Sequence, residues 1–491
     1  MLYQNCEPRL KSTKRSWFLF LVLNVLIITL IGGYFSTQVD ASSNTFTEQK
    51  ITFDSGKNKY KEKLTGTILI PNNSNQSNQK RAGIVLVHGS GEVNQSEIRR
   101  EAEVFAKAGI VTFIYTKRTI GYDKANRNYD LLADDVIQAV TLLQKRSDVD
   151  PKKVGTWGVS EGGWVAPLAA SKSDKIAFVI TIGAPGVPPI QQQTWNIENR
   201  FHNQDFHSKS AINSIINNGA GVLFSITKTF FHPDAAIYDP IPPLKKMKQP
   251  ILAMWGSIDR QVPPAESGNI FKNTFESSGN NKYTIQYLEG ADHSGWNSKD
   301  NGFTPLFTLF PGNAEAMISW LQQVLNDNPP IAKVIGKTPK QMSISSPETT
   351  ELHWYDHYVL QFGILLLFLI LFGGYFILGT INFFRKNKSY SSPFRWKQRI
   401  FALSGLISVL SFWSYLLYIW MSGGKKVGFV IGQWPFIWIV IFIFAWLTII
   451  SLFVLLFSWF QTHKKQKRVL LLIIGGILFI PWAIYWQILF L

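Results

Sequence analysis

The sequence predicts an α/β domain with a mostly parallel, doubly covered sheet, followed by an all-α transmembrane domain. Between residues 83 and 325, short unbroken apolar runs alternate with helical segments, which is typical of parallel strands with helices on both faces. Glycine-rich turns end several of these runs. After residue 358, four apolar stretches are each long enough to cross a bilayer. A chain of 491 residues has room for more than one domain.

The amino-terminal segment has the features of a membrane-targeting sequence. Basic residues lie within residues 1–16, and an apolar run extends from Trp17 to Phe35. Such a segment is either a signal anchor or a cleavable signal peptide. Small residues around Ala41 suit cleavage, whereas the long apolar run suits a retained helix, which is the alternative we favour. Both alternatives assign residues 1–40 to targeting and place the α/β domain outside the cytoplasm.

Two kinds of pattern predict the strands of the α/β domain. Alternation predicts strands at 51–54 and 64–70, and unbroken apolar runs predict buried strands after them. The buried strands are expected at 83–88, 110–115, 154–157, 176–183, 250–256 and 283–288, and helices at about 96–108, 130–145, from 162 onward and 313–324. Because strand and helix alternate, residues 41–326 are expected to form one domain.

An insertion at about residues 184–249 is too long for a plain loop. It is expected to form a small cap with its own apolar face, built from aromatic side chains. These are Trp195, Phe201, Phe206, Phe224, Phe230 and Phe231. We interpret them as packing residues rather than substrate contacts, because buried aromatic side chains mainly serve packing. Residues 327–358 are polar, contain proline and are predicted to be a tether.

Residues 359–491 are predicted to be a four-helix transmembrane domain. The spans are expected at about 359–384, 400–421, 434–460 and 469–491. The loop 385–399 holds six Lys or Arg, the loop 461–468 four and the loop 423–428 two. Since basic loops face the cytoplasm, this pattern predicts a multi-pass cell-membrane protein with its α/β domain outside. No ionisable residue lies within the four spans, which disfavours an ion or proton transporter.

The net charge of +17 does not indicate nucleic-acid binding, because of where the charges lie. Residues 41–358 contain 33 Lys or Arg and 30 Asp or Glu, whereas residues 359–491 contain 12 basic residues and no acidic one. The excess is therefore a pattern of membrane topology. The lipid bilayer, and not nucleic acid, is the expected partner. The one cysteine, Cys6, excludes a disulfide within the chain.

The stretch around Ser160 carries the strongest chemical signal. Gly158 and Gly162 bracket Ser160 in the pattern G-x-S-x-G, between a predicted strand and a predicted helix. In such an elbow, strained backbone exposes the serine hydroxyl at the sheet edge, and the flanking positions must lack side chains. The helix amino terminus also favours a developing negative charge. A serine nucleophile is therefore predicted at residue 160.

Two residues downstream complete a predicted catalytic triad. Asp259 and His293 each come after a buried strand, and the order Ser, Asp, His is one that serine hydrolases use. Ser160 is predicted to attack, His293 to act as general base and then acid, and Asp259 to fix the tautomer of His293. The backbone N–H groups of Ser90 and Glu161 are the predicted oxyanion hole.

Other residues near these motifs are candidates for the same roles. His88 precedes the oxyanion turn and is interpreted as structural, and Asp292 is a disfavoured alternative acid because it adjoins His293 in sequence. The side chain of Glu161 is interpreted as positioning or substrate-facing. The remaining histidines of residues 41–358 lack metal-ligand spacing and are interpreted as surface or packing residues, so no metal is expected.

These motifs resemble those of the α/β-hydrolases, in particular the bacterial serine esterase and aminopeptidase-like group related to dienelactone hydrolases and the prolyl-oligopeptidase catalytic domain. The resemblance covers about residues 51–325. The matching motifs are His88-Gly89-Ser90-Gly91, Leu132-Ala133-Asp134-Asp135-Val136, Gly158-Val159-Ser160-Glu161-Gly162-Gly163, Gly256-Ser257-Ile258-Asp259 with Val262-Pro263, and Gly290-Ala291-Asp292-His293. The resemblance implies hydrolysis of an ester, thioester or amide without a cofactor. Relatives often carry Asp-x-Arg-Gly-x-Gly where this chain has residues 115–121, so the substrate-side wall is expected to differ.

The resulting hypothesis is a membrane-anchored, extracytoplasmic serine hydrolase, carboxylesterase-like or a peptidase. Its expected substrates are small-molecule, lipid-linked or cell-wall-linked acyl compounds. The alternative is a catalytically inactive hydrolase fold that serves as a binding or sensing module. We favour the enzyme because the triad residues and the elbow glycines are all present. The residue usage suits a bacterial cell surface.

Overall fold

The computed structural model describes residues 45–72, 80–232, 234–341, 343, 345, 352–384, 395–461 and 467–491. The predicted amino-terminal span, Trp17 to Phe35, lies outside the described residues. Residues Phe46–Leu491 form one compact unit.

A nine-stranded sheet in the order β1-β2-β4-β3-β5-β6-β7-β8-β11 forms the centre of the α/β domain. Its strands are β1 (Phe46–Ser55), β2 (Glu62–Pro71), β3 (Arg81–Val87), β4 (Val111–Tyr115), β5 (Val149–Val159), β6 (Val179–Ile182), β7 (Ile251–Gly256), β8 (Tyr283–Leu288) and β11 (Lys333–Ile335). The pairs β1–β2 and β2–β4 are antiparallel, and all other neighbouring pairs are parallel. The prediction of a mostly parallel sheet is confirmed.

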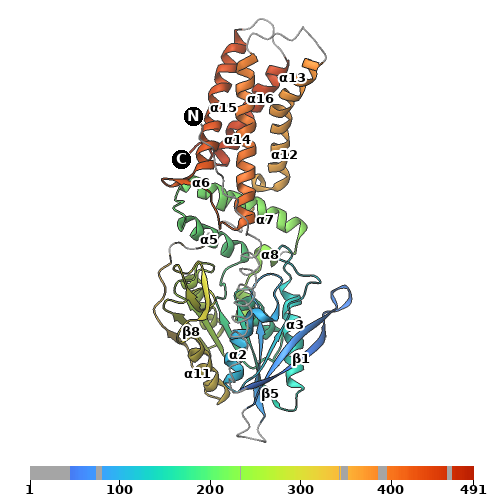
Figure 1. Cartoon of the computed structure of the whole chain (residues 1–491), viewed down its shortest axis with the longest axis vertical. Helices are drawn as coiled ribbons and strands as arrows, with labels where there is room; N and C mark the ends of the chain where they lie inside the picture. The colour runs from blue at the N-terminus through green and yellow to red at the C-terminus, as the bar shows by residue number, and fades with distance from the viewer. Residues whose placement is uncertain are drawn as a thin grey trace, which may run out of the picture. The chain divides into compact units, whose positions relative to one another are not determined.

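Helices cover both faces of this sheet (Figure 1). Helices α2 (Arg99–Lys107) and α11 (Asn313–Leu325) pack on one face, and α3 (Tyr129–Gln144), α4 (Gly162–Lys172) and α10 (Pro264–Ser278) pack on the other. Alternate residues of β3 pack on opposite faces of the sheet. Ile84 and Leu86 pack on the face covered by α2 and α11, and Val85 and Val87 pack on the face covered by α3, α4 and α10. An apolar run without alternation is therefore what this position in the fold requires.

The domain extends beyond the predicted boundary at residue 326. Strand β11 pairs in parallel with β8 inside the segment predicted to be a tether. Further along, Gln341 accepts hydrogen bonds from the backbone of Ala265 and Glu266. The expectation of a polar tether is therefore corrected, because this segment supplies an edge strand and contacts to the domain surface.

The insertion after β6 forms a helical cap. Its elements are α5 (Pro189–His202), α6 (Lys209–Asn213), the π-helical turn η3 (Ser214–Asn218), α7 (Gly219–Phe230), α8 (Asp234–Ile237) and α9 (Ile241–Lys246). Because β6 ends at the same sheet edge as β5, the cap begins beside the elbow at the end of β5. The cap also touches the loop after β7, where the side chain of Gln192 donates to the carbonyl of Gln261.

Four apolar helices of the carboxy-terminal part are long enough to span a membrane, as predicted. They are Tyr358–Ile381, Arg395–Ser422, Phe436–Phe460 and Lys467–Tyr485. The first comprises α12 (Tyr358–Phe368), the π-helical turn η6 (Leu369–Gly373) and the start of α13 (Gly374–Phe384), and the others are α14, α15 and α16. They lie side by side as a bundle (Figure 1). The last helix ends at Tyr485, six residues short of the predicted end.

The apolar face of the cap belongs to the bundle and not to the cap alone. Phe201 and Phe206 are buried in one cluster with bundle residues such as Ile419 and Trp438. Polar contacts reinforce this packing: Arg200 donates to the carbonyl of Gly423, and the backbone N–H of Val427 donates to Gln204. The expectation of a self-contained cap is thus corrected. Two of the cap aromatics, Phe230 and Phe231, remain 64% and 39% exposed.

Candidate active site

Ser160 lies in a strained elbow between β5 and α4. Its φ of 56° is in the left-handed region that non-glycine residues rarely occupy. A Cβ atom at Gly158 would lie 2.2 Å from the carbonyl oxygen of Gly162, and a Cβ at Gly162 would lie 2.4 Å from that of Val87. Side chains at these positions are therefore excluded by backbone, which explains the two glycines of the motif. The elbow holds the serine at the carboxyl end of the sheet.

Asp259 and His293 meet at the same edge. Asp259 comes after β7 and His293 after β8, and Nδ1 of His293 lies 2.8 Å from Oδ2 of Asp259. The other oxygen of Asp259 accepts the backbone N–H groups of Gln261 and Val262 at 2.8 and 2.9 Å. Both side chains are almost fully buried. The carboxylate is thus fixed by the backbone on one side and oriented toward the imidazole on the other.

Gly183 lies between Ser160 and His293. The N–H of Ser160 donates to the carbonyl of Ile182 at 2.9 Å, and a Cβ at Gly183 would lie 2.8 Å from Nδ1 and Cε1 of His293. Serine and imidazole therefore flank the same short turn after β6. Within the described chain, no hydrogen bond joins the hydroxyl of Ser160 to His293. In many hydrolases this bond tightens only when substrate binds.

The environment of His293 sets its protonation. Burial by itself lowers the pKa of this imidazole, but the charge of Asp259, the hydrogen bond with it and the charge of Asp292 outweigh burial. The pKa of His293 consequently lies above its ordinary value of 6.5. The site therefore stabilises the imidazolium, which is the form that His293 would take after accepting a proton as a general base.

The raised pKa of His293 predicts the pH dependence of hydrolysis. Because only neutral His293 accepts a proton, kcat/KM for an uncharged ester is expected to fall as pH drops through an apparent pKa above 6.5. The measurement is a pH–rate profile of the full chain in detergent. An acid limb centred below 6.5 would contradict the stabilisation of the His293 imidazolium by Asp259, and no acid limb at all would contradict the assignment of His293 as the base.

The oxyanion turn packs directly on the elbow. A Cβ at Gly89 would lie 3.5 Å from Cβ of Ser160, so the turn passes close to this serine. Among the described residues, the N–H groups of Ser90 and Glu161 donate to no other protein group. Two unused N–H donors beside the serine fit the role predicted for them.

The two alternative residues have structural roles here. Asp292 accepts the backbone N–H groups of Ser294 and Trp296 at 3.0 and 2.8 Å, so it shapes the loop that carries His293. His88 is buried edge-on against Tyr115, and burial, with the charge of Lys117, lowers the pKa of His88 to about 3. His88 is therefore neutral and enclosed by protein.

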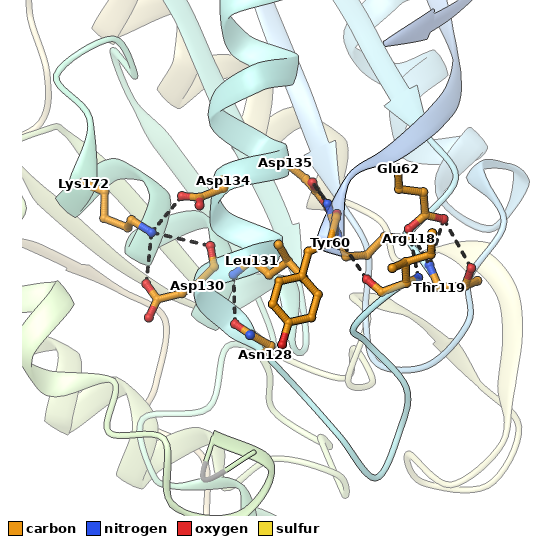
Figure 2. A network of polar contacts seen from close by, with 11 residues as sticks. Tyr60, Glu62, Arg118, Thr119, Asn128, Asp130, Leu131, Asp134, Asp135 and Lys172 are labelled. Carbon is orange, nitrogen blue, oxygen red and sulfur yellow. Dashed lines mark hydrogen bonds and ion pairs between the residues drawn. The ribbon is translucent and has the colours of Figure 1, made fainter. Parts of the chain in front are cut away.

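The loop that departs from the family pattern, residues 115–121, is anchored inward. Arg118 is fully buried and makes two 2.6 Å contacts with the carboxylate of Asp135. It also donates to the carbonyl of Tyr60, while Glu62 accepts the N–H of Thr119 (Figure 2). Arg118 thus ties α3 and the β1–β2 turn to this loop. Its side chain faces protein, so it does not supply a substrate contact.

Sequence reasoning missed two contacts around the site. Glu101 on α2 accepts a 2.7 Å hydrogen bond from the indole of Trp296, just beyond the His293 loop, and burial raises the pKa of Glu101. The carboxylate of Glu161 is buried against Lys117. Both contacts join residues far apart in the chain, so no local motif indicates them. In the described residues, no cluster of three metal-ligating side chains occurs.

A doubly wound sheet of this order, with a serine elbow and a His–Asp pair at its carboxyl edge, is the arrangement of the α/β-hydrolase fold. Residues 137–294 match the family described as BAAT / acyl-CoA thioester hydrolase C terminal. That segment contains the elbow, Asp259 and His293.

Several curated and solved proteins are similar to parts of this chain. The chain is 30% identical over 103 residues to the thiohydrolase AneE of Aspergillus aculeatus, covering 20% of this chain and 32% of that protein. It is 34% identical over 86 residues to the polyketide transferase ClaH of Penicillium crustosum, covering 17% and 28%. A dienelactone hydrolase structure from Anabaena variabilis superimposes with a TM-score of 0.36 and 17% identity, over 58% of this chain and all of that one. The chain thus spans about a third of the length of these curated relatives.

Proposed function

We propose that this protein is a membrane-anchored serine hydrolase that cleaves an acyl thioester or ester on the extracytoplasmic side. The family match and the fold support a hydrolase of the thioester and ester type. The observation that carries the catalytic assignment is the 2.8 Å contact of His293 with Asp259 at the sheet edge where Ser160 sits in its elbow.

The proposed mechanism has two acyl-transfer steps. Nε2 of His293 takes the hydroxyl proton as Oγ of Ser160 attacks the carbonyl carbon, and the N–H groups of Ser90 and Glu161 stabilise the oxyanion. The tetrahedral intermediate collapses, the bond to the leaving thiol or alcohol breaks, and His293 returns its proton to that group. A water, deprotonated by His293, then attacks the acyl-enzyme. This releases a carboxylic acid and restores Ser160.

The connectivity of the bundle supports the extracytoplasmic side. The helix ends near the cap are those at Tyr358, Ser422, Phe436 and Tyr485, since these or adjoining residues bond to cap groups. The basic loops 385–399 and 461–468 join the opposite ends of the same helices. Because basic loops favour the cytoplasm, the hydrolase end of the bundle is proposed to lie outside.

The position of the cap supports an acyl substrate held in or near the membrane. The cap begins beside the elbow and packs into the apolar core of the bundle. At the start of the first helix, the ring of Phe230 lies 5.4 Å from that of Tyr358, and aromatic side chains of this kind favour the membrane interface. A lipid-linked or cell-wall-linked acyl chain is therefore the substrate class we propose.

A membrane-impermeant fluorophosphonate probe tests the nucleophile and the side together. Intact cells with the wild-type protein are expected to be labelled, and cells with Ser160→Ala are not, because the probe reacts with an activated serine. Labelling only after lysis would place the domain in the cytoplasm. Absence of labelling in both, with folded protein present, would favour the inactive binding or sensing module.

A further inference from the structure

Lys117 and Glu161 form a buried ion pair next to Ser160. Nζ of Lys117 is 2.6 Å from Oε1 of Glu161, and the two side chains are only 3% and 1% exposed. Burying two charges is costly unless further hydrogen bonds satisfy them. Glu161 is the residue directly after Ser160, and Lys117 belongs to the loop after β4. Neither residue is a member of the triad.

All three donors of Lys117 are used within the protein. An ammonium group has three N–H bonds. Nζ of Lys117 contacts the carbonyl oxygen of Gly89 at 2.6 Å, the hydroxyl of Tyr122 at 3.1 Å and the carboxylate of Glu161 at 2.6 Å. No donor remains for a substrate. Any effect of Lys117 on catalysis must therefore act through the groups that it holds.

Those groups carry the oxyanion turn. The hydroxyl of Tyr122 donates to Oε1 of Glu161 at 2.6 Å and accepts the N–H of Gly91 at 3.0 Å. Lys117 thus holds the carbonyl of Gly89, and Tyr122 holds the N–H of Gly91, on either side of Ser90. Both are bonded to Glu161, whose own N–H is the second proposed donor. One buried network connects the two halves of the oxyanion hole.

We propose that Lys117 and Tyr122 are positioning residues that set the spacing between the N–H groups of Ser90 and Glu161 for the oxyanion. This inference rests on the proposed function and extends it. Stabilisation by such donors depends on their lying about 2.7–3.1 Å from the oxyanion itself. A network that fixes both donors to one carboxylate keeps this distance when the substrate's carbonyl becomes tetrahedral.

The test compares variants of the full chain purified in detergent. Lys117→Met combined with Glu161→Gln removes both charges of the Lys117–Glu161 pair. The amide of the new glutamine still offers an oxygen to Arg127, whose Nη1 lies 3.5 Å from Oε2 of Glu161. Tyr122→Phe removes only the hydroxyl. The double variant is expected to lose about 10²-fold in kcat on p-nitrophenyl butyrate, which is the size of losing one oxyanion donor. Tyr122→Phe is expected to lose roughly tenfold, since one held N–H is released while the ion pair stays.

A second readout separates positioning from general damage. The affinity for an alkyl trifluoromethyl ketone, which forms a tetrahedral adduct with the serine, should fall in parallel with kcat/KM, while KM changes less than about threefold. Lys172→Met is the control, because Lys172 pairs with Asp130 and Asp134 on the surface and is expected to change neither value (Figure 2).

The outcomes distinguish a failure of this inference from a failure of the proposed function on which it rests. If wild type hydrolyses the ester through Ser160 but the Lys117 and Tyr122 variants keep both kcat and ketone affinity, the positioning role is wrong. If kcat falls without loss of ketone affinity, it is also wrong. If wild-type Ser160 neither hydrolyses the ester nor reacts with fluorophosphonate, the proposed function itself fails.

Discussion

Replacing Asp259 with asparagine is expected to lower kcat for an ester about 10⁴-fold while the fold is retained. The amide oxygen of the new side chain would stay on the backbone N–H groups of Gln261 and Val262, which now hold Oδ1. Its NH₂ group would then face Nδ1 of His293 in place of Oδ2. A donor at this position forces the imidazole proton onto Nε2, so His293 can no longer accept the serine proton. The measurement is steady-state hydrolysis by the detergent-purified chain.

The residue beside His293 in the chain provides a matched control for this experiment. Asp292→Asn keeps an oxygen for the N–H groups of Ser294 and Trp296, and it does not contact the imidazole nitrogen. We expect its kcat to stay within about tenfold of wild type, because it changes loop geometry and a lesser charge contribution to the pKa of His293 but leaves the hydrogen bond with Asp259 in place. A large loss in Asp292→Asn with little loss in Asp259→Asn would make Asp292 the triad acid.

Replacing Arg118 with methionine is expected to destabilise the α/β domain by about 3–5 kcal/mol. The change leaves the carboxylate of Asp135 buried without its partner and removes donors from the carbonyls of Tyr60 and Ile120. Burial already raises the pKa of Asp135 with Arg118 present. Without Arg118 this carboxyl would bind a proton more readily folded than unfolded, so the loss should shrink as pH falls.

The double variant Arg118→Met/Asp135→Leu separates the charge from the packing. Replacing a whole buried pair with apolar side chains is often close to neutral, whereas removing one partner is not. Urea unfolding monitored by tryptophan fluorescence gives the two free energies. If the double variant is as unstable as the single one, the backbone contacts of Arg118, and not the unpaired charge, explain the loss.

Local signals explain why the sheet and the positions of the triad residues were predictable. Each buried strand is an apolar run with a polar or glycine-rich turn after it, and parallel strands put those turns at one edge. A Cβ atom at Gly158 or Gly162 would lie only 2.2 or 2.4 Å from a backbone oxygen, so both positions require glycine. The roles of Ser160, Asp259 and His293 stay predictions until activity is measured.

One helix was missed although its signals were present. Helix α10 begins at Pro264, a residue favoured in a first helical turn, and ends before Gly279, whose φ of 76° is typical of a helix terminus. These start and stop signs flank a segment without a strong apolar stripe. Its buried residues follow helical spacing, but Ser267, Gly268 and Thr274 share the buried face with Phe271 and Phe275, so the face is only weakly apolar.

Other features depend on partners distant in sequence. Lys117 and Glu161 are 44 residues apart, and no sequence pattern at either position indicates that the two are in contact. Strand β11 is three residues long and becomes a strand only because β8 offers an edge. The cap aromatics were recognisable as packing residues, but the sequence does not say against what. Their partner is the bundle of apolar helices, which is distant in sequence: Arg200 bonds to Gly423, 223 residues further along the chain.

The shared core of cap and bundle makes the two parts inseparable in practice. The side chains that would be uncovered by cutting after residue 358 include Ile197, Phe201, Phe206 and Ile215, all of which are fully buried in the intact chain. Water-exposed apolar surface of this kind promotes aggregation. Proteolytic shedding would therefore not release a free soluble enzyme. If the four apolar helices cross a membrane as proposed, the α/β domain would be kept there by its own folding requirement as well as by its spans.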